Sequence, residues 1–235
     1  SAMETEDFVA SADDRYAEGW RTSSTIFCTS SSCGEQPAVV QMQQRAAALL
    51  GIPSECARFS ATRNRPRSLA CTHARAPARK PTRCRWYTGP RGIRITHSLG
   101  LGRHSDTQIV RYEPGESYNQ HHDQNSLRDE PSGVRALTLF VYLSDPADPD
   151  AGGETVFPEL GLAVTPRKGR AVLWPNVKLR APDESDRRTF HAGAPVERGV
   201  KFGANLWFYA FPFQRFWHAG CPLHAQFAHP HHQSQ

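Results

Sequence analysis

The sequence lacks three features that mark common classes of protein. It contains no run of about 18 apolar residues, the length that a membrane-spanning helix needs, so we expect no membrane segment. No pair among its six cysteines has the C-x-x-C spacing of a zinc knuckle. No pattern returns at a period of about 20–50 residues, which excludes a solenoid or a propeller. With 235 residues, 38% of them hydrophobic, the chain can bury the core of one sizeable domain or two small ones.

Acidic residues are absent from one long segment, residues 61–105. This segment carries 11 of the 28 Lys and Arg residues, whereas the rest of the chain holds 17 basic and 23 acidic residues, a net charge of −6. The overall charge of +5 therefore comes from this segment alone. A basic stretch can bind nucleic acid or an acidic surface, but no RNA-binding signature accompanies this one. We expect an inserted, solvated loop and no nucleic-acid partner.

The cysteines and the N-terminus leave the compartment open. Cys28 and Cys33 flank a serine-rich turn, and their spacing is compatible with a loop disulfide. A structural disulfide would suit a secretory compartment. The chain opens with Ser1, Ala2 and Met3, which is typical of a cloning remnant, so a signal or anchor can have been removed.

Proline and glycine punctuate the chain into short elements. One helix is predicted from Pro37 to Leu50, because proline occupies its first turn and Gly51 and Pro53 follow its end. Later in the chain, runs rich in β-branched and aromatic residues alternate with turn residues. These runs are TQIVRYEPG, RALTLFVYLSD, GLAVTP, GRAVLWP and KFGANLWFYAF. The pattern predicts a mainly β chain with an N-terminal helix, folded as an antiparallel sandwich or jelly roll.

The stretch YNQHHDQNSL contains two residue types that ligate metals. In a strand, side chains alternate between faces, so His121 and Asp123 share a face and His122 points away. Two such ligands hold a metal only if a third residue reaches it. Two histidines and one carboxylate with open coordination positions are typical of non-haem Fe(II) oxygenases.

The third ligand is expected at His191 rather than at His218. The other histidines lie in the basic segment or in the tail. Ten residues after His191, Lys201 precedes an apolar run. The even offset would keep both side chains on one face if no bulge or turn intervened, although the residues ERG between them indicate a turn. A buried lysine is costly without an anionic partner, and the far carboxylate of a 2-oxo acid would supply one. We interpret His218 as a packing or surface residue.

With these motifs the chain resembles the Fe(II)- and 2-oxoglutarate-dependent prolyl 4-hydroxylases of the collagen, plant and algal type. The resemblance runs from about Thr107 to Phe211. The matching blocks, in order, are RYEPGESYNQHHD, RALTLFVYLSD, GGETVFPE, KGRAVLWPN and HAGAPVERGVKFGANLWF. Towards the N-terminus, WRTSSTIF resembles the substrate-covering loop of this family, and GIPSE resembles its continuation. The loop Arg21–Thr29 is accordingly expected to act as a lid.

The resemblance implies roles for nine residues. It implies Fe(II) ligands at His121, Asp123 and His191, 2-oxoglutarate contacts at Lys201, Thr155 and Tyr112, and substrate contacts at Tyr118, Arg135 and Trp207. Two departures stand out. Ala194 occupies a position where many relatives have cysteine, and residues 61–105 interrupt a junction that is short in relatives.

The resemblance also implies a fold and domain limits. Residues 106–214 are expected to form a double-stranded β-helix, which is a cupin-like jelly roll and the Fe(II)/2-oxoglutarate dioxygenase core. Residues 1–60 would form an N-terminal helical and lid region, 61–105 a basic inserted loop and 215–235 a C-terminal tail.

The expected function is the 4-hydroxylation of proline in proline-rich peptides, with Fe(II), O2 and 2-oxoglutarate, releasing succinate and CO2. Ascorbate is expected as a further cofactor, and the endoplasmic reticulum or secretory pathway as the compartment. Two alternatives stay open. In the first, the chain is a 2-oxoglutarate dioxygenase that acts on another residue or on a small molecule. In the second, it is a non-catalytic module that binds proline-rich peptides. The sequence decides neither the peptide nor the oligomeric state.

Overall fold

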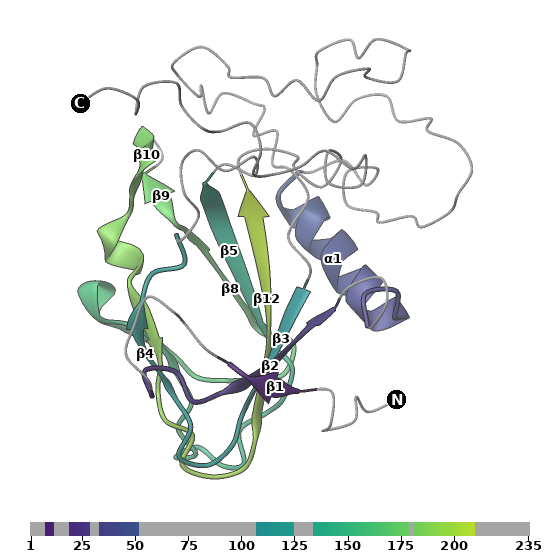
Figure 1. The fold of residues 1–235 in the computed structure, drawn as a ribbon, viewed down its shortest axis with the longest axis vertical. Coiled ribbons are helices and arrows are strands. Elements are labelled where there is room, and N and C mark those ends of the chain that lie inside the picture. Colours follow the sequence, from purple (N-terminus) through teal and green to yellow (C-terminus); the bar gives the residue numbers. More distant parts are fainter. Residues whose placement is uncertain are drawn as a thin grey trace, which may run out of the picture.

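The computed structural model describes residues 8–11, 19–28, 33–51, 107–124, 134–178 and 181–209. This described part contains two main antiparallel sheets, a short two-stranded ribbon and one α-helix (Figure 1). The segment 61–105, the tail 215–235 and His218 lie outside the described residues, so what was expected of them stays a prediction.

The larger sheet has the strand order β1-β2-β3-β12-β5-β8, and every neighbouring pair is antiparallel. Its strands are β1 (Val9–Ala10), β2 (Ser24–Cys28), β3 (Thr107–Tyr112), β12 (Lys201–Tyr209), β5 (Arg135–Tyr142) and β8 (Ala171–Pro175). The smaller sheet has the order β4-β11-β6-β7. It consists of β4 (Tyr118–His121), β11 (His191–Gly193), β6 (Thr155–Phe157) and β7 (Leu162–Val164). The predicted mainly β fold with a jelly-roll core is confirmed.

Short elements complete the described chain. The two-stranded ribbon pairs β9 (Val177–Lys178) with β10 (Ala181–Ser185). Two 3₁₀ helices, η2 (Pro158–Leu160) and η3 (Arg187–Thr189), lie in the loops. The second of these leads directly into β11 and so determines how that strand enters the site.

The predicted N-terminal helix is observed as α1 (Pro37–Leu49). Proline stands in its first turn, where a missing N–H costs nothing. At the other end Gly51 has a φ of 66°, a left-handed conformation that ends helices. The side chain of Gln43 donates to Thr107 Oγ1 at 3.0 Å, which fixes α1 to the start of β3.

Strand β12 is buried on both faces, which explains its nearly unbroken apolar sequence. On one face Ala204, Leu206 and Phe208 pack in the cluster that includes residues of α1. On the other face the large sheet meets the small one, where the rings of Phe157 and Trp174 lie 5.3 Å apart. Figure 1 shows α1 and β4 on opposite sides of the central strands. The core is thus layered as helix, large sheet and small sheet.

The disulfide that the cysteine spacing allowed is present. Cys28 at the end of β2 bonds to Cys33, which shortly precedes α1, with the Cα atoms 4.5 Å apart. Both residues are buried in the cluster between the large sheet and α1. The bond therefore ties the edge of the large sheet to the helix that covers it.

Five residues of the expected lid loop Arg21–Thr29 form a β-strand. Ser24–Cys28 is β2, which pairs with β1 on one side and β3 on the other, so the loop prediction is wrong for these five residues. The cause is the edge of β3, whose backbone groups need partners. An extended STIFC segment provides them, and Thr25 Oγ1 also donates to the Ile109 carbonyl at 3.1 Å.

Gly203 in β12 leaves room for an aromatic ring. A Cβ atom at this position would lie 2.2 Å from Cζ of Phe140. We expect Gly203→Ala to destabilise the fold by about 1–3 kcal/mol, because the ring must move. Urea unfolding measures this, with Gly193→Ala as the control, since its Cβ would meet no atom closer than 3.7 Å. Equal losses in the two variants would contradict the steric explanation.

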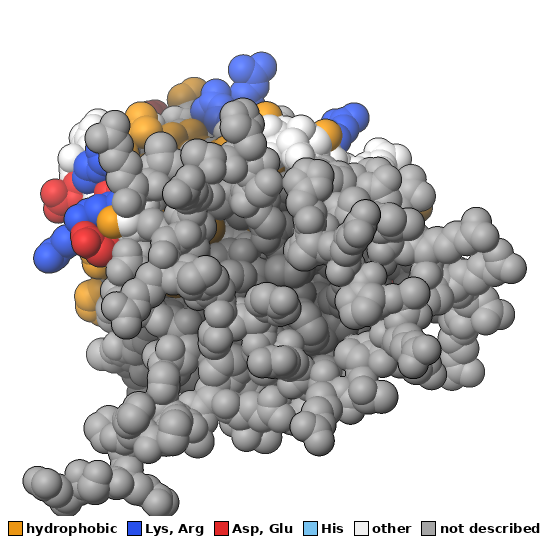
Figure 2. All heavy atoms as spheres, turned by 90° about the horizontal axis from the view of Figure 1, so that it is seen from above, with side chains coloured by type: hydrophobic (Ala, Val, Ile, Leu, Met, Phe, Trp, Pro, Cys, Tyr) orange, Lys and Arg blue, Asp and Glu red, His pale blue; other side chains and the backbone are white. Residues whose placement is uncertain are grey.

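The described surface carries charges of both signs. Figure 2 shows Lys and Arg side chains beside Asp and Glu side chains on the described part of one face. Exposed ion pairs of this kind include Lys178–Glu184 and Arg198–Asp148, both at 2.6 Å, and such pairs contribute little stability. No helix within the described residues is long and apolar enough to cross a bilayer.

Candidate active site

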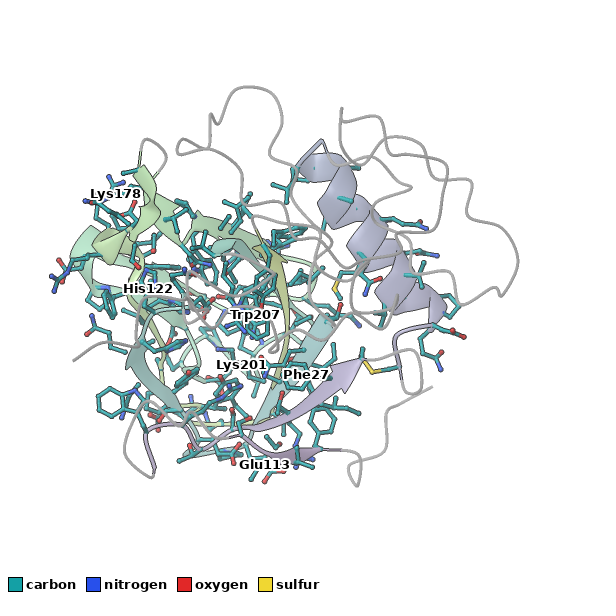
Figure 3. All side chains as sticks on the ribbon, turned by 45° about the horizontal axis from the view of Figure 1, so that its top comes forward. Phe27, Glu113, His122, Lys178, Lys201 and Trp207 are labelled. Atoms are coloured by element: carbon teal, nitrogen blue, oxygen red, sulfur yellow. A yellow bond between two sulfur atoms is a disulfide. The ribbon has the colours of Figure 1, made fainter. Side chains whose placement is uncertain are left out.

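A cavity of about 360 Å³ opens between the two sheets. Its wall contains all nine residues that the sequence nominated. They are Tyr112, Tyr118, His121, Asp123, Arg135, Thr155, His191, Lys201 and Trp207. Figure 3 shows Lys201 and Trp207, both from β12, in the interior of the molecule. Residues from six strands and one loop thus meet at one place.

Three metal-ligand side chains converge at the small sheet. His121 ends β4 and His191 begins β11, and the two residues are paired across these strands. Asp123 Oδ1 lies 3.7 Å from His121 Nε2 and 3.8 Å from His191 Nε2. The three side chains are buried, and their ligand atoms all lie within 4.8 Å of one another. Two imidazoles and a carboxylate in this arrangement fit an Fe(II) ion with open positions.

The imidazoles are held in the tautomer that ligation requires. His121 Nδ1 donates to the Asn119 carbonyl at 2.8 Å, and His191 Nδ1 donates to the Thr189 carbonyl at 2.9 Å. Each Nε2 therefore has a free lone pair directed at the shared centre. Burial, followed by the neighbouring His191, lowers the pKa of His121 to about 3. This imidazole is therefore neutral at neutral pH, as a metal ligand must be.

Two hydrogen-bond donors orient the carboxylate of Asp123. Asp123 Oδ2 accepts from Thr138 Oγ1 at 2.7 Å and from Trp207 Nε1 at 3.2 Å. Asn176 Nδ2 donates to the same Thr138 hydroxyl at 2.8 Å, which directs the hydroxyl proton to the carboxylate. Burial raises the pKa of Asp123, but the facing imidazoles and the Thr138 hydrogen bond outweigh it and lower the pKa to about 2. Asp123 is therefore an anion in a polar cradle.

Thr138 is expected to contribute to metal affinity through this hydrogen bond. Thr138→Val keeps the shape of the side chain but cannot donate to Asp123 Oδ2. The Kd for Mn(II) should rise about tenfold, the lower range for the loss of a group that orients a ligand. Calorimetric titration measures it. Thr138→Ser, which keeps the hydroxyl, should bind nearly as the wild type does, and equal affinities in the two variants would show that the bond does not orient the ligand.

Lys201 lies in the same cavity as a buried cation. Its Nζ lies 4.9 Å from the ring centre of Tyr112, 5.5 Å from Phe140 and 5.9 Å from Tyr142. Among the described residues, no carboxylate lies within ion-pair distance of it. Burial lowers the pKa of Lys201 to about 8, a fall that the charge of Glu154 limits. An ammonium group enclosed by rings, with no paired carboxylate, is suited to an anionic ligand.

Hydroxyl groups surround this cation. Tyr112 pairs with Lys201 across β3 and β12, and Thr155 lines the cavity from β6. Tyr142, which the sequence had not singled out, donates to Thr155 Oγ1 at 2.7 Å. Burial raises the pKa of both tyrosines, so their phenols stay protonated at neutral pH. The sequence signal for Tyr142 was its alternation with Thr138 along β5, which places both on one face.

One detail of the predicted geometry is wrong and one condition is not met, although the convergence is observed. Asp123 does not share a strand with His121, because β4 ends at His121 and Asp123 lies in the bend that follows. His191 and Lys201 do not share a strand either, since residues 194–200 turn between β11 and β12. The two side chains line one cavity because their sheets face each other.

The three residues expected near a substrate have contacts within the protein as well. Tyr118 stacks on His121 with ring centres 3.5 Å apart, and the guanidinium of Arg21 lies 4.6 Å from the Tyr118 ring centre. Arg135 lies 4.2 Å above the Trp207 ring and donates to the Asp123 carbonyl at 3.3 Å. Arg135 and Trp207 therefore support the metal-ligand loop besides lining the cavity.

Other residues of the wall escaped the sequence analysis. They include Gln108, Phe140, Trp174 and Asn205, whereas Arg21 and Phe27, which also line the cavity, belong to the expected lid loop. Asn205 donates to Gln108 Oε1 at 3.0 Å across β12 and β3. Amide side chains within otherwise apolar strands were the available signal, because a buried polar group needs a partner.

Comparison with known proteins gives a consistent result. Residues 107–209 match the 2OG-Fe(II) oxygenase superfamily. The prolyl 4-hydroxylase subunit alpha-2 of Gallus gallus is 41% identical over 108 residues, which are 43% of this chain and 19% of that one. The subunit alpha-1 of Homo sapiens is 40% identical over 116 residues, 46% of this chain and 21% of that one. The chain thus covers about a fifth of the length of these relatives.

A solved structure extends the agreement in fold. The prolyl hydroxylase from Trichoplax adhaerens, in complex with a hypoxia inducible factor oxygen degradation domain peptide fragment, aligns with a TM-score of 0.50. The alignment covers 87% of this chain and 71% of that one at 17% identity, which shows a shared fold. Residues 107–209 are therefore similar to the 2OG-Fe(II) oxygenase superfamily, and the expected resemblance to prolyl 4-hydroxylases is confirmed.

Proposed function

We propose that this protein is a 2-oxoglutarate-dependent dioxygenase that hydroxylates C4 of proline in proline-rich peptides, releasing succinate and CO2. One observation carries the proposal. Three metal-ligand side chains and a buried lysine without an ion-pair partner among the described residues share one cavity of about 360 Å³. A peptide-binding module would need neither the neutral imidazoles nor the enclosed ammonium group.

Two groups of residues in the cavity would bind different ligands. His121, Asp123 and His191 would hold Fe(II), which supplies the oxygen chemistry when bound. Lys201 would pair with the 5-carboxylate of 2-oxoglutarate by charge-assisted hydrogen bonds. Thr155 and Tyr112 line the same cavity, and their hydroxyl groups would share the carboxylate. Because Lys201 is buried among aromatic rings, water would be kept from the ion pair.

The open side of the cavity suits an extended peptide. Proline-rich chains are preformed polyproline II helices and dock on aromatic surfaces at low entropic cost. Tyr118, Trp207 and the stacked guanidinium of Arg135 would provide such a surface. Ascorbate would keep the iron reduced. The Cys28–Cys33 disulfide supports a compartment of the secretory pathway, such as the endoplasmic reticulum, because such bonds persist in oxidising surroundings.

Mass spectrometry tests the proposal. Poly-proline and collagen-like peptides are incubated with the protein, Fe(II), 2-oxoglutarate and ascorbate, and the Asp123→Ala variant serves as the control. We expect the gain of one oxygen atom per modified proline in the wild-type sample only, with fragmentation placing it on the proline ring. Decarboxylation of 2-oxoglutarate without any change in the peptides would indicate another substrate. Peptide binding without decarboxylation would indicate a binding module.

A further inference from the structure

In the sequence His122 stands between the metal-ligand residues His121 and Asp123, but it is not one of the three converging side chains. It is 5% exposed, and it is not part of the cavity wall. Figure 3 shows it set apart from Lys201 and Trp207, on the side of the molecule where Lys178 lies. A buried polar side chain normally has hydrogen-bond partners, and the partners of His122 connect two segments that lie far apart in the sequence.

Both ring nitrogens of His122 bond to the backbone. The N–H of Gln124 donates to Nδ1 at 3.0 Å. A backbone amide can only donate, so Nδ1 is the acceptor and Nε2 carries the hydrogen. Nε2 donates to the carbonyl of Asp186 at 3.1 Å, with the hydroxyl of Thr189 at 3.3 Å. The ring of Phe190 packs edge-on against the imidazole at 5.0 Å.

A chain of hydrogen bonds leads from the Asp186 carbonyl to the ring of His191. It accepts from the N–H of Thr189 at 3.0 Å and from the Thr189 hydroxyl at 2.9 Å. The Thr189 carbonyl in turn accepts from His191 Nδ1 at 2.9 Å. A displacement of Asp186 would therefore move the peptide unit that orients the His191 ring.

On the other side, His122 secures the loop that carries Asp123. Gln124 follows Asp123 directly, and its Oε1 accepts from the backbone N–H of Arg135 at 2.8 Å. The pairing of β4 with β11 ends at the pair His121 and His191. Beyond that pair no backbone ladder joins the two strands in the described structure, and the imidazole of His122 supplies the connection.

We propose that His122 is a positioning residue of the metal site. Its ring holds the loop of Asp123 and the turn before His191 at a fixed separation, so that Asp123 Oδ1 and His191 Nε2 stay 3.8 Å apart. The inference rests on the metal site of the proposed function and on no assumption about the substrate. Groups that orient metal ligands in this way typically change metal affinity by about 10–100-fold.

Metal titration of three His122 variants tests the inference. His122→Phe keeps the ring volume and the contact with Phe190 but removes both hydrogen bonds. Its Kd for Mn(II), and for Fe(II) without oxygen, should rise about 10–100-fold. His122→Asn keeps an acceptor for Gln124 but cannot reach Asp186, so it should weaken binding similarly. His122→Gln places an amide nitrogen near the position of Nε2 and should restore most of the affinity.

The thermal midpoint of the metal-free protein separates positioning from simple packing. A packing role would lower this midpoint in His122→Phe and leave the metal Kd unchanged, and that result would overturn the inference. If His122→Phe does not fold, the difference between the Asn and Gln variants decides in the same way. A wild type that binds no metal overturns the proposed function itself. Normal wild-type binding with equal affinities in all variants overturns only the role of His122.

Discussion

Asp123→Ala is expected to abolish Fe(II) binding and, with it, all turnover of 2-oxoglutarate. Asp123 supplies the single anionic ligand among the three side chains that converge in the described structure. The two imidazoles that remain are neutral donors, and His121 stays neutral because burial and His191 lower its pKa to about 3. The Kd for Fe(II) should rise by about a thousandfold, which corresponds to about 4 kcal/mol. Anaerobic calorimetry measures the Kd, and release of CO2 from 2-oxoglutarate measures the turnover.

The control for Asp123→Ala must separate a lost ligand from a weakened fold. In the folded protein the pKa of Asp123 is about 2, below its ordinary value of 3.8. Because this pKa is lowered, the carboxylate stabilises the fold above about pH 4 by roughly 2 kcal/mol, and this contribution is lost as the pH falls through 2. Asp123→Ala should therefore also lose stability at neutral pH. Asp123→Asn keeps an acceptor for Thr138 and Trp207, so it should be more stable than the Ala variant and still bind Fe(II) poorly. Wild-type affinity in both variants would place the metal elsewhere.

The chemistry of the candidate site could be predicted from sequence because the types and positions of its residues are unusual for structural residues. Lys201 opens an apolar strand, and His121 and Asp123 are metal-ligand residue types two positions apart, a spacing that shares a face in a strand. A buried charge or imidazole is costly without a partner, so each of them pointed to a ligand. All three line the cavity that the structure contains. Local signals served for two other features. Helix-end residues predicted α1, and the cysteine spacing was compatible with the disulfide.

The residues that support the site could not be predicted in this way. Thr138 and Asn176 are common residue types, and the hydrogen bond between them exists only because β5 and β8 pair in one particular register. Sequence distance also misled. The offset of ten between His191 and Lys201 would fit one face of a strand, but sequence spacing cannot show which sheet a strand joins. The segment Ser24–Cys28 joined the large sheet because β3 offered it backbone partners, which is a tertiary effect.

Lys201→Met is expected to have opposite effects on stability and on ligand binding. In the folded protein the pKa of Lys201 is about 8, below its ordinary value of 10.5. Below pH 8 the lysine is protonated in both the folded and the unfolded state, and the full cost of burying the charge destabilises the fold. That cost is roughly 3 kcal/mol. Methionine fills a similar space without a charge, so the ligand-free variant should be more stable than the wild type by about this amount at neutral pH.

The sign of the pH dependence gives a second test of Lys201→Met. Between pH 8 and 10.5 the unfolded wild-type chain binds more protons at Lys201 than the folded one, so wild-type stability rises with pH relative to the variant. The difference in the free energy of unfolding should therefore be largest near neutral pH and should vanish near pH 10.5. Urea unfolding at the two pH values measures it. Lys178→Met is the control, because the Lys178 side chain is 52% exposed and its loss should change neither stability nor pH dependence appreciably.

Binding of 2-oxoglutarate should move in the other direction. The carboxylate of the ligand would lose its cationic partner in a closed site, a loss worth about 3–5 kcal/mol, or a Kd raised by a factor of about 10²–10⁴. With Mn(II) present, 2-oxoglutarate should raise the thermal midpoint of the wild type and of Lys178→Met but not that of Lys201→Met. A Lys201→Met variant that is less stable than the wild type and binds 2-oxoglutarate equally well would make Lys201 a structural residue. A gain in stability coupled to a loss of ligand binding is the pattern of a cation buried for its ligand rather than for its fold, because only the ligand compensates the cost of its burial.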